Sequence, residues 1–251
     1  MQSFSHDGFD IAFIDEGEGD PILLIHGFAS NHFVNWVSPG WTKTLREAGY
    51  RVVALDNRGH GRSSRSYDPA DYTPPKMASD AVALLDRLDI GRAHLFGYSM
   101  GARLAAFVAL QAPEKVATLI FGGLGIGMVE GVGEWDVIAD ALSAEDPGAV
   151  TDARGQMFRK FADQTRSDRH ALAACIATSR ELLSAEQVAQ IGQPTLVAVG
   201  TKDDIGGSPE RLAELMPNAV AFAVEGRDHM LSVGDRTFKT RVLEFLKENP
   251  L

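Results

Sequence analysis

The 251-residue sequence contains one cysteine, Cys175, so no disulfide can form within the chain. A disulfide-stabilised fold is therefore excluded, and the reducing cytoplasm is the expected location. Cys175 lies in the apolar run 171–177, which favours a buried and unreactive thiol. No stretch approaches the ~18 consecutive apolar residues of a membrane span. Residues 1–7 show neither the basic nor the apolar segment of a signal peptide, so we expect no secretion signal.

Basic residues are also scarce relative to acidic ones. Lysine and arginine number 24 against 34 aspartate and glutamate residues, which gives a formal net charge of −10. An acidic surface repels nucleic acids and anionic membranes, so neither is an expected partner, and a small-molecule substrate is. The seven histidines lack metal-ligand spacing with cysteine or carboxylate residues, so we expect neither a metal nor another cofactor. The sequence supports no prediction of the oligomeric state.

Apolar runs of strand length recur along the chain, and several are continuous rather than alternating, as in 22–25 and 196–199. Continuous runs suit strands that are covered on both faces. Helical patterns separate them, so the sequence predicts an α/β fold with a mostly parallel central sheet flanked by helices. The expected strands are 9–14, 21–25, 51–55, 93–96, 116–121, 194–199 and 220–224. The expected helices between and after them are 43–48, 78–88, 101–110, 209–215 and 236–246.

One segment, 124–191, contains no strand pattern. It shows helical stretches near 134–142, 149–163, 168–179 and 185–191, and Ser184 and Gln187 have the spacing of a capping box. A helical insertion between two strands of a sheet predicts a small cap over one edge of that sheet. The predicted core domain therefore comprises 1–123 and 192–251, with 124–191 as the inserted cap. A separate linker domain is disfavoured because a strand pattern returns at Pro194.

The motif Gly97-Tyr98-Ser99-Met100-Gly101 lies between an expected strand and an expected helix. A serine at the tip of such a turn has strained backbone angles, and side chains two positions either way would collide with the turn. The turn lifts the serine hydroxyl above the sheet, where a substrate can reach it. It also aims the first N–H groups of the helix at a developing negative charge. The motif in this context indicates a nucleophilic serine.

With this motif the sequence resembles the α/β-hydrolase family over nearly its whole length. His26-Gly27-Phe28 is similar to the family's oxyanion loop, and the resemblance implies that the N–H groups of Phe28 and Met100 form the oxyanion hole. His26 is usually structural in this motif. Residues 56–63 resemble the family loop D-x-R-G-x-G-x-S. Arg58 and His60 could form an anion site there, but a turn held in place by hydrogen bonds is the favoured interpretation.

A serine nucleophile needs an adjacent base, normally a histidine that a carboxylate orients. In this fold the acid and then the histidine follow the serine. Only His170 and His229 lie downstream; His170 falls in the expected cap, whereas His229 follows the last strand pattern, where the family places its base. The family pattern G-x-x-D, counted from Gly200, indicates Asp203 as the acid.

Two other carboxylates are weaker candidates for the acid. Asp204 lies one residue beyond Asp203, so its side chain is expected to point elsewhere. Asp228 is adjacent to His229 in the chain and cannot easily fold back onto the ring of its neighbour. We therefore expect the catalytic set Ser99, Asp203 and His229.

The resemblance implies a carboxylesterase-like serine hydrolase that works through an acyl-enzyme. Dehalogenases and epoxide hydrolases carry aspartate at the position of Ser99, and hydrolases of C–C bonds commonly carry tryptophan where Met230 stands. Three alternatives stay open: a cofactor-free perhydrolase or haloperoxidase, a non-enzymatic small-molecule receptor with a preserved triad, and a lyase of the menaquinone-pathway type. The lyase elbow, G-Y-S-[LM]-G-G-R, is similar to Gly97–Arg103, but Ala102 departs from it.

The substrate pocket is the least constrained part of the site. A mostly apolar pocket would suit a small or medium acyl ester. Aromatic and methionine residues at helical spacing are typical of a core as well as of a pocket. The candidate substrate-binding residues are Trp36, Tyr98, Met128, Trp135 and Phe161.

Overall fold

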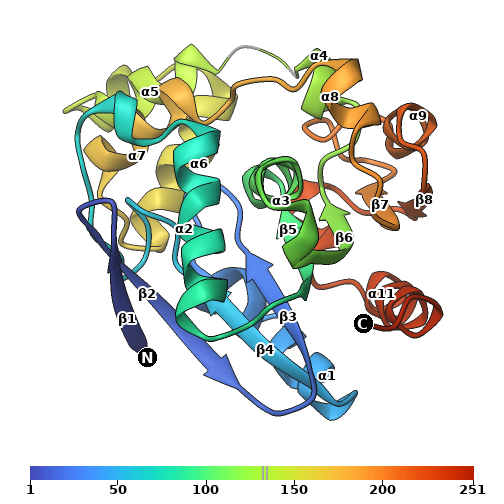
Figure 1. Ribbon diagram of the computed structural model, residues 1–251. Coiled ribbons are helices and arrows are strands. Elements are labelled where there is room, and N and C mark those ends of the chain that lie inside the picture. Colours follow the sequence, from blue (N-terminus) through green and yellow to red (C-terminus); the bar gives the residue numbers. More distant parts are fainter. Residues whose placement is uncertain (132, 134) are drawn as a thin grey trace.

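The computed structural model describes residues 1–131, 133 and 135–251, and its strands form one sheet in the order β1-β2-β4-β3-β5-β6-β7-β8. The pairs β1–β2 and β2–β4 are antiparallel, and every other neighbouring pair is parallel (Figure 1). This confirms the mostly parallel sheet. The strands are β1 (Gln2–His6), β2 (Phe9–Glu16), β3 (Asp20–Ile25), β4 (Tyr50–Leu55), β5 (Ala93–Tyr98), β6 (Val116–Gly122), β7 (Thr195–Gly200) and β8 (Ala219–Val224).

All seven expected strands are present, and the sequence analysis missed only the edge strand β1 within the described chain. β1 reads Gln-Ser-Phe-Ser-His, with a single apolar residue, and none of its residues is fully buried. A two-residue turn, Asp7-Gly8, joins it to β2, and both turn residues have positive φ, 49° and 79°. Asp-Gly between two strands is the strongest short hairpin signal, so this turn was the clue to β1.

Both faces of the sheet are covered, as the continuous apolar runs predict. In β3, Leu23 and Ile25 pack into one core, whereas Ile22 and Leu24 pack into the other, and all four are fully buried. Residues alternate between the two faces of a strand, so a strand covered on both faces has no polar positions. Helices α2 (Pro74–Arg87), α3 (Met100–Gln111) and α9 (Pro209–Leu215) cover the first face, and α1 (Trp41–Glu47) and α11 (Arg236–Glu248) cover the second (Figure 1).

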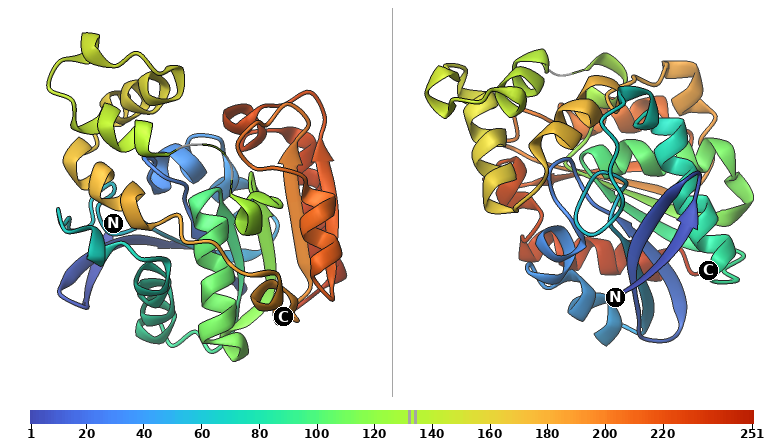
Figure 2. Two further views of the ribbon diagram at one scale, coloured as in Figure 1. Left: turned by 90° about the horizontal axis from the view of Figure 1, so that it is seen from above. Right: turned by 90° about the vertical axis from the view of Figure 1, so that its left-hand side faces the viewer.

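The described part of residues 124–191 contains helices joined by loops, and no strand. Helices α5 (Asp136–Ser143), α6 (Ala153–Gln164) and α7 (Arg169–Thr178) pack on one another and project to one side of the sheet (Figure 2). The predicted helix start at Glu134 lies outside the described residues. The division of the chain into core and cap stays a prediction. The shorter helices are η1 (Phe33–Val37), η2 (Pro69–Asp71), η3 (Pro113–Lys115), α4 (Gly127–Glu130), η4 (Pro147–Ala149), α8 (Ala185–Ala189) and α10 (His229–Ser232).

Helix α8 begins with the predicted capping box. The Ser184 hydroxyl accepts a hydrogen bond from the Gln187 N–H, and the Gln187 side chain accepts one from the Ser184 N–H. α8 contacts α9, so the last part of residues 124–191 packs on a helix that covers the sheet (Figure 1).

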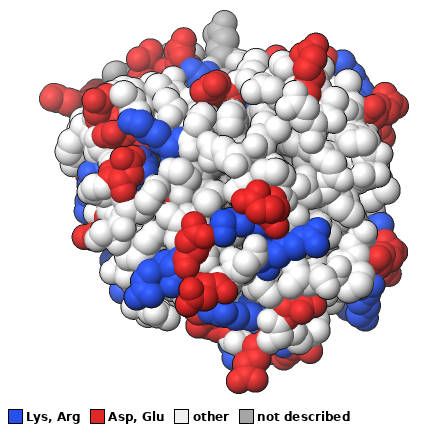
Figure 3. Space-filling view, in the orientation of Figure 1, with Lys and Arg blue, Asp and Glu red and all other residues white. Residues whose placement is uncertain are grey.

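The surface mixes charges of both signs. On the face shown in Figure 3, acidic and basic side chains are interspersed in the lower part and near the edges, around a broad uncharged area. Among the described helices, none is both long and apolar enough to cross a membrane.

The loop after β4 is the hydrogen-bonded turn that the sequence favoured. Arg58 is fully buried and donates through Nε and Nη2 to Asp80 of α2, at 2.8 and 2.7 Å. It also donates to the Asp71 carbonyl oxygen. Asp80 is 1% exposed, so this pair lies in the low-dielectric interior and joins the loop to α2.

Asp80→Asn removes the buried one of the two carboxylates that pair with the Arg58 guanidinium; the other, Asp7, is 50% exposed and lies 3.3 Å from Nη1. Breaking a buried ion pair by removing one partner costs about 3–5 kcal/mol, so we expect a loss of that size in the free energy of unfolding, measured with urea. Asp86→Asn, on the exposed side of the same helix, is the control and should cost less than about 1 kcal/mol. Equal effects of the two substitutions would contradict this account of the loop.

Candidate active site

Ser99 occupies the strained turn between β5 and α3, with φ 54° and ψ −114°. A Cβ atom on Gly97 would lie 2.1 Å from the Gly101 carbonyl oxygen, and one on Gly101 would lie 1.9 Å from the Ile25 carbonyl oxygen. Glycine is therefore required at both positions, since the backbones of β3, β5 and α3 touch there. The expected nucleophile elbow is confirmed as a geometry.

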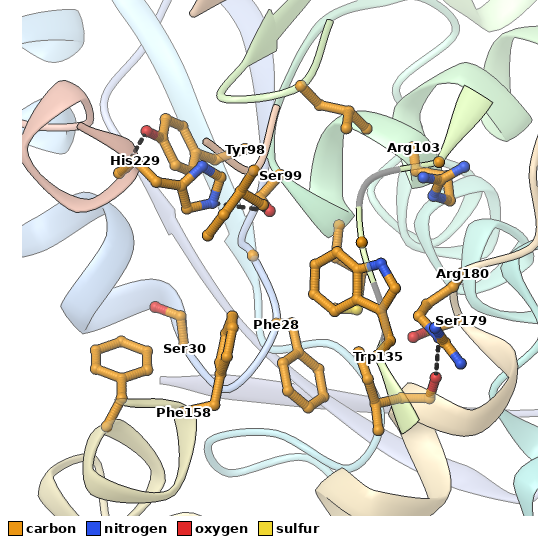
Figure 4. Close-up of a pocket in the computed structure, with 18 of the residues that line it drawn as sticks. Phe28, Ser30, Tyr98, Ser99, Arg103, Trp135, Phe158, Ser179, Arg180 and His229 are labelled. Atoms are coloured by element: carbon orange, nitrogen blue, oxygen red, sulfur yellow. Dashed lines mark hydrogen bonds between the residues drawn. The ribbon is translucent and has the colours of Figure 1, made fainter. Parts of the chain in front are cut away.

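His229 lies beside Ser99 and points its ring toward the serine hydroxyl (Figure 4). Its Nε2 lies 3.1 Å from the Ser99 Oγ, and its Nδ1 lies 2.8 Å from Oδ2 of Asp203. The histidine is the first residue of α10, and Asp228 caps that helix by accepting hydrogen bonds from two backbone N–H groups. The three residues predicted from the sequence are thus brought together, and Asp228 has the separate position expected of it.

The carboxylate that faces the histidine is held from its other side. Oδ1 of Asp203 accepts hydrogen bonds from the N–H groups of Ile205 and Gly206, at 2.8 and 2.9 Å, and the side chain is fully buried. These two donors orient Oδ2 toward the imidazole. Asp204 points away, with a side chain 83% exposed and its Oδ2 3.9 Å from Arg154. The structure therefore places Asp203, and not Asp204, beside the histidine.

The loop after β3 lies directly against the elbow. A Cβ atom on Gly27 would lie 3.4 Å from the Ser99 Cβ, and the Gly27 N–H donates to Oδ1 of Asn35 at 3.0 Å. Phe28 and Met100 line the same cavity as Ser99. Met100 begins α3, where a helix leaves its backbone N–H without an intrahelical acceptor. The expected oxyanion hole at Phe28 and Met100 stays a prediction.

The histidines near this loop are structural. The Asn57 N–H donates to Nε2 of His26 at 2.9 Å, so its Nδ1 carries the proton and donates to the Gly27 carbonyl oxygen. Burial lowers the pKa of His26. Burial also lowers the pKa of His60 to about 3, so this ring is neutral, and its Nδ1 lies 3.0 Å from the Arg58 carbonyl oxygen. Neither Arg58 nor His60 lines the cavity at Ser99.

A cavity of about 710 Å³ opens above Ser99 and His229. Tyr98, Trp135 and Phe161 line it, in agreement with three of the substrate-binding candidates. Tyr98 also donates from its hydroxyl to the His229 carbonyl oxygen at 2.5 Å, which fixes the backbone of the histidine. Burial raises the pKa of the Tyr98 phenol well above its usual value, so it acts as a donor.

The other two candidates were wrong. Trp36 is fully buried in the core on the far face of the sheet, with its ring 4.7 Å from that of Phe96. Met128 is fully buried in the first core. Both are large apolar side chains that fill the interior, and the sequence pattern of a core residue is the same as that of a lining residue.

The sequence analysis also missed several lining residues. Phe158 precedes Phe161 by three residues on α6, and helical neighbours at that spacing share a face, so this signal was available. Ser179 and Arg180 follow α7 and line the opposite part of the cavity from Ser99 (Figure 4). No periodicity in the sequence marks them.

A family model of the alpha/beta hydrolase fold matches residues 20–154. The chain belongs to this family. It is 28% identical to a non-heme chloroperoxidase of Kitasatospora aureofaciens, over 97% of this chain and 98% of that protein. A hydrolase from Pseudomonas aeruginosa PA01 shares its structure with a TM-score of 0.80 and 26% identity, over 98% of this chain and 97% of that one.

A further relative of this α/β hydrolase is longer than the chain itself. It is the dihydrolipoyllysine-residue acetyltransferase component of an acetoin cleaving system from Pseudomonas putida, 31% identical over 92% of this chain. The match spans only 64% of that relative.

Gly101→Ala should damage both the fold and the elbow of this α/β hydrolase. The added methyl overlaps the backbone of β3, so we expect destabilisation of about 1–3 kcal/mol, which lowers Tm by several degrees. Displacement of Ser99 should also lower kcat/KM by ~10²-fold. The control is Gly91→Ala, where a methyl meets nothing within 4 Å. An unchanged Tm and rate for Gly101→Ala would show that the backbone contact has no such importance.

Proposed function

We propose that this α/β hydrolase cleaves a small or medium carboxylic ester through an acyl-enzyme on Ser99. The observation that carries the proposal is the continuous chain of contacts from Asp203 through His229 to the Ser99 hydroxyl, at 2.8 and 3.1 Å. A serine hydroxyl is a weak nucleophile until a positioned base removes its proton. The protein is proposed to act in the cytoplasm, in line with its single buried thiol.

The proposed reaction has two halves, formation of the acyl-enzyme and its hydrolysis, and the same residues act in both. The Ser99 Oγ attacks the ester carbonyl carbon while its proton passes to Nε2 of His229, and the Asp203 carboxylate stabilises the imidazolium. The N–H groups of Phe28 and Met100 bind the tetrahedral oxyanion. The C–O bond to the alcohol then breaks, and His229 returns the proton to the leaving oxygen. Water repeats the sequence on the acyl-enzyme and releases the acid.

The size and lining of the cavity support a medium-sized acyl or alcohol group. Its volume of about 710 Å³ lies within the range of ~300–1,000 Å³ typical of small-molecule sites. Phe28, Phe158 and Phe161 line it beside Ser99 and supply apolar surface against which a hydrocarbon group of the substrate can pack.

A second candidate, a peroxide-using enzyme on the same triad, is favoured by the likeness to the non-heme chloroperoxidase. Hydrogen peroxide would replace water in the second half, so the acyl-enzyme would yield a peracid. The two candidates are separated by comparing the rate at which the enzyme forms a peracid from a carboxylic acid and peroxide with the rate at which it hydrolyses an ester. The lyase alternative gains no support, because Arg103 donates to three backbone carbonyl oxygens. The receptor alternative would show as binding of a small molecule without its turnover.

Substitution of the triad tests the proposal on p-nitrophenyl esters of increasing chain length. We expect Ser99→Ala to lower kcat by ~10⁶-fold and Asp203→Asn by ~10⁴-fold, because the nucleophile is indispensable whereas the acid only orients the base. A fluorophosphonate should label the wild type at Ser99.

Asp204→Asn is the matched control for Asp203→Asn, because Asp204 is adjacent in the chain but exposed. It should retain the wild-type rate. Turnover that survives Ser99→Ala, or an Asp204→Asn variant as slow as Asp203→Asn, would rule out the proposed roles.

A further inference from the structure

The cavity at Ser99 is cationic in one part and apolar in another. Arg103 and Arg180 both line it, with Ser179 beside them, and in Figure 4 they lie on the far side of Trp135 from Ser99 and His229. An ester made only of hydrocarbon groups would form no charge interaction with these two guanidinium groups.

Arg103 is a buried cation whose charge is not neutralised by an adjacent carboxylate. It is 7% exposed, and it donates from Nη1 to the carbonyl oxygens of Met128 and Glu181 and from Nη2 to that of Gly127, at 3.0, 2.9 and 3.3 Å. Among residues 1–131, 133 and 135–251, no carboxylate forms an ion pair with it. Burial, followed by repulsion from Arg180, lowers the pKa of Arg103 to about 10. Three of its N–H groups donate to carbonyl oxygens, which carry no full charge, and the attraction from the Glu181 carboxylate is weaker than the repulsion from Arg180.

Arg180 supplies the second charge, and its guanidinium is held by fewer hydrogen bonds than that of Arg103. Its Nε donates to the Ile176 carbonyl oxygen at 2.8 Å, and its Nη2 donates to Asp136 at 2.9 Å. The Asp136 side chain is 93% exposed, and an exposed ion pair contributes little. The guanidinium carbon lies 5.9 Å from the centre of the Trp135 ring, which bounds the cavity. An anion inside the cavity can therefore compete with Asp136 for Arg180.

The carboxylates that line the cavity do not cancel these charges. Glu130 is bound through both oxygens by Arg211, which is not a lining residue. Glu181 is exposed, and its contact with Arg103 is made by the backbone carbonyl oxygen. The part of the cavity around the two arginines thus keeps an excess of positive charge within a largely apolar surrounding, where charge interactions are strong.

We propose that the substrate is an ester that carries a second, anionic group, a carboxylate, and that Arg180 binds this group while the ester carbonyl lies at Ser99. This inference rests on the proposed ester hydrolysis and specifies its substrate class. Arg103 adds its charge to the subsite, whereas Arg180 is the direct ligand, because two N–H groups at Nη1 and one at Nη2 of Arg103 already donate to backbone carbonyl oxygens. Arg180 and Ser99 line the same cavity on opposite sides of Trp135, so a spacer separates the ester from the anion.

Binding to the Ser99→Ala variant tests this without any need for turnover. Monomethyl adipate and dimethyl adipate have the same chain and differ by one negative charge. We expect calorimetry to show the monoanion binding about tenfold or more tightly, as for a charge-assisted hydrogen bond. Adding Arg180→Gln should remove the preference, and Arg180→Lys should restore part of it.

Arg169→Gln is the matched control. Arg169 is the first residue of α7, the helix that Arg180 follows; its side chain is 32% exposed against 27% for Arg180, and it does not line the cavity. This variant should keep the full preference for the monoanion. Equal binding of the two adipates, or a preference that survives Arg180→Gln, would overturn the proposed anion subsite.

Turnover by the wild-type enzyme then locates the carboxylate within the substrate. Monomethyl adipate carries it on the acyl side and 4-acetoxybenzoate on the alcohol side, and each is compared with its neutral methyl ester. A higher kcat/KM for one of the anions assigns the side. Preferential binding of the anion without any cleavage would refute ester hydrolysis and support the anion subsite. Equal cleavage of charged and neutral esters would support ester hydrolysis and refute the anion subsite.

Discussion

The site depends on a backbone contact that leaves no room for a side chain. At the elbow, Gly101 touches the end of β3, and Gly97 touches Gly101, so Ser99 is forced to a positive φ. A non-glycine residue in such a conformation costs about 1–3 kcal/mol and persists only where the surroundings over-determine it. Here the parallel pairing of β3 with β5 and the packing of α3 provide that constraint. The hydroxyl, the first N–H of α3 and the Gly27 loop are placed by the same contact.

The remaining members of the site follow from the direction of the strands. Parallel strands present their carboxyl ends at one edge, and ligands of such sheets bind outside that edge. The Gly27 loop follows β3, Ser99 follows β5, Asp203 follows β7 and His229 follows β8. Chain segments up to 202 residues apart therefore meet at one place without long connections. Local bonds then set each side chain, as when two backbone N–H groups turn the Asp203 carboxylate toward the imidazole.

The sequence predicts what local patterns determine and fails where three-dimensional context decides. The continuous runs of β3 and β7 identify buried strands because both faces of each strand are covered. The elbow can be recognised because its tight turn requires glycine at 97 and 101. Asp203 and His229 can be recognised because they follow Ser99 in the chain in the order acid, then histidine. Trp36 and Met128 could not be separated from Trp135 and Phe161, since a cavity and a core both favour large apolar side chains. Which of them faces the cavity depends on how the inserted helices pack against the sheet, and that packing has no local pattern.

Arg103 connects the triad to the inserted segment. It stands on α3, one turn beyond Ser99, and its guanidinium bonds to the backbone carbonyls of residues 127, 128 and 181. Because backbone carbonyls are present whatever the side chains, these bonds hold the segment against α3 while its sequence is free to vary. The lining that the segment supplies, such as Trp135, Phe158 and Arg180, can then change without moving Ser99. Under the proposed function, substrate choice and ester hydrolysis belong to different parts of the chain, which Arg103 joins.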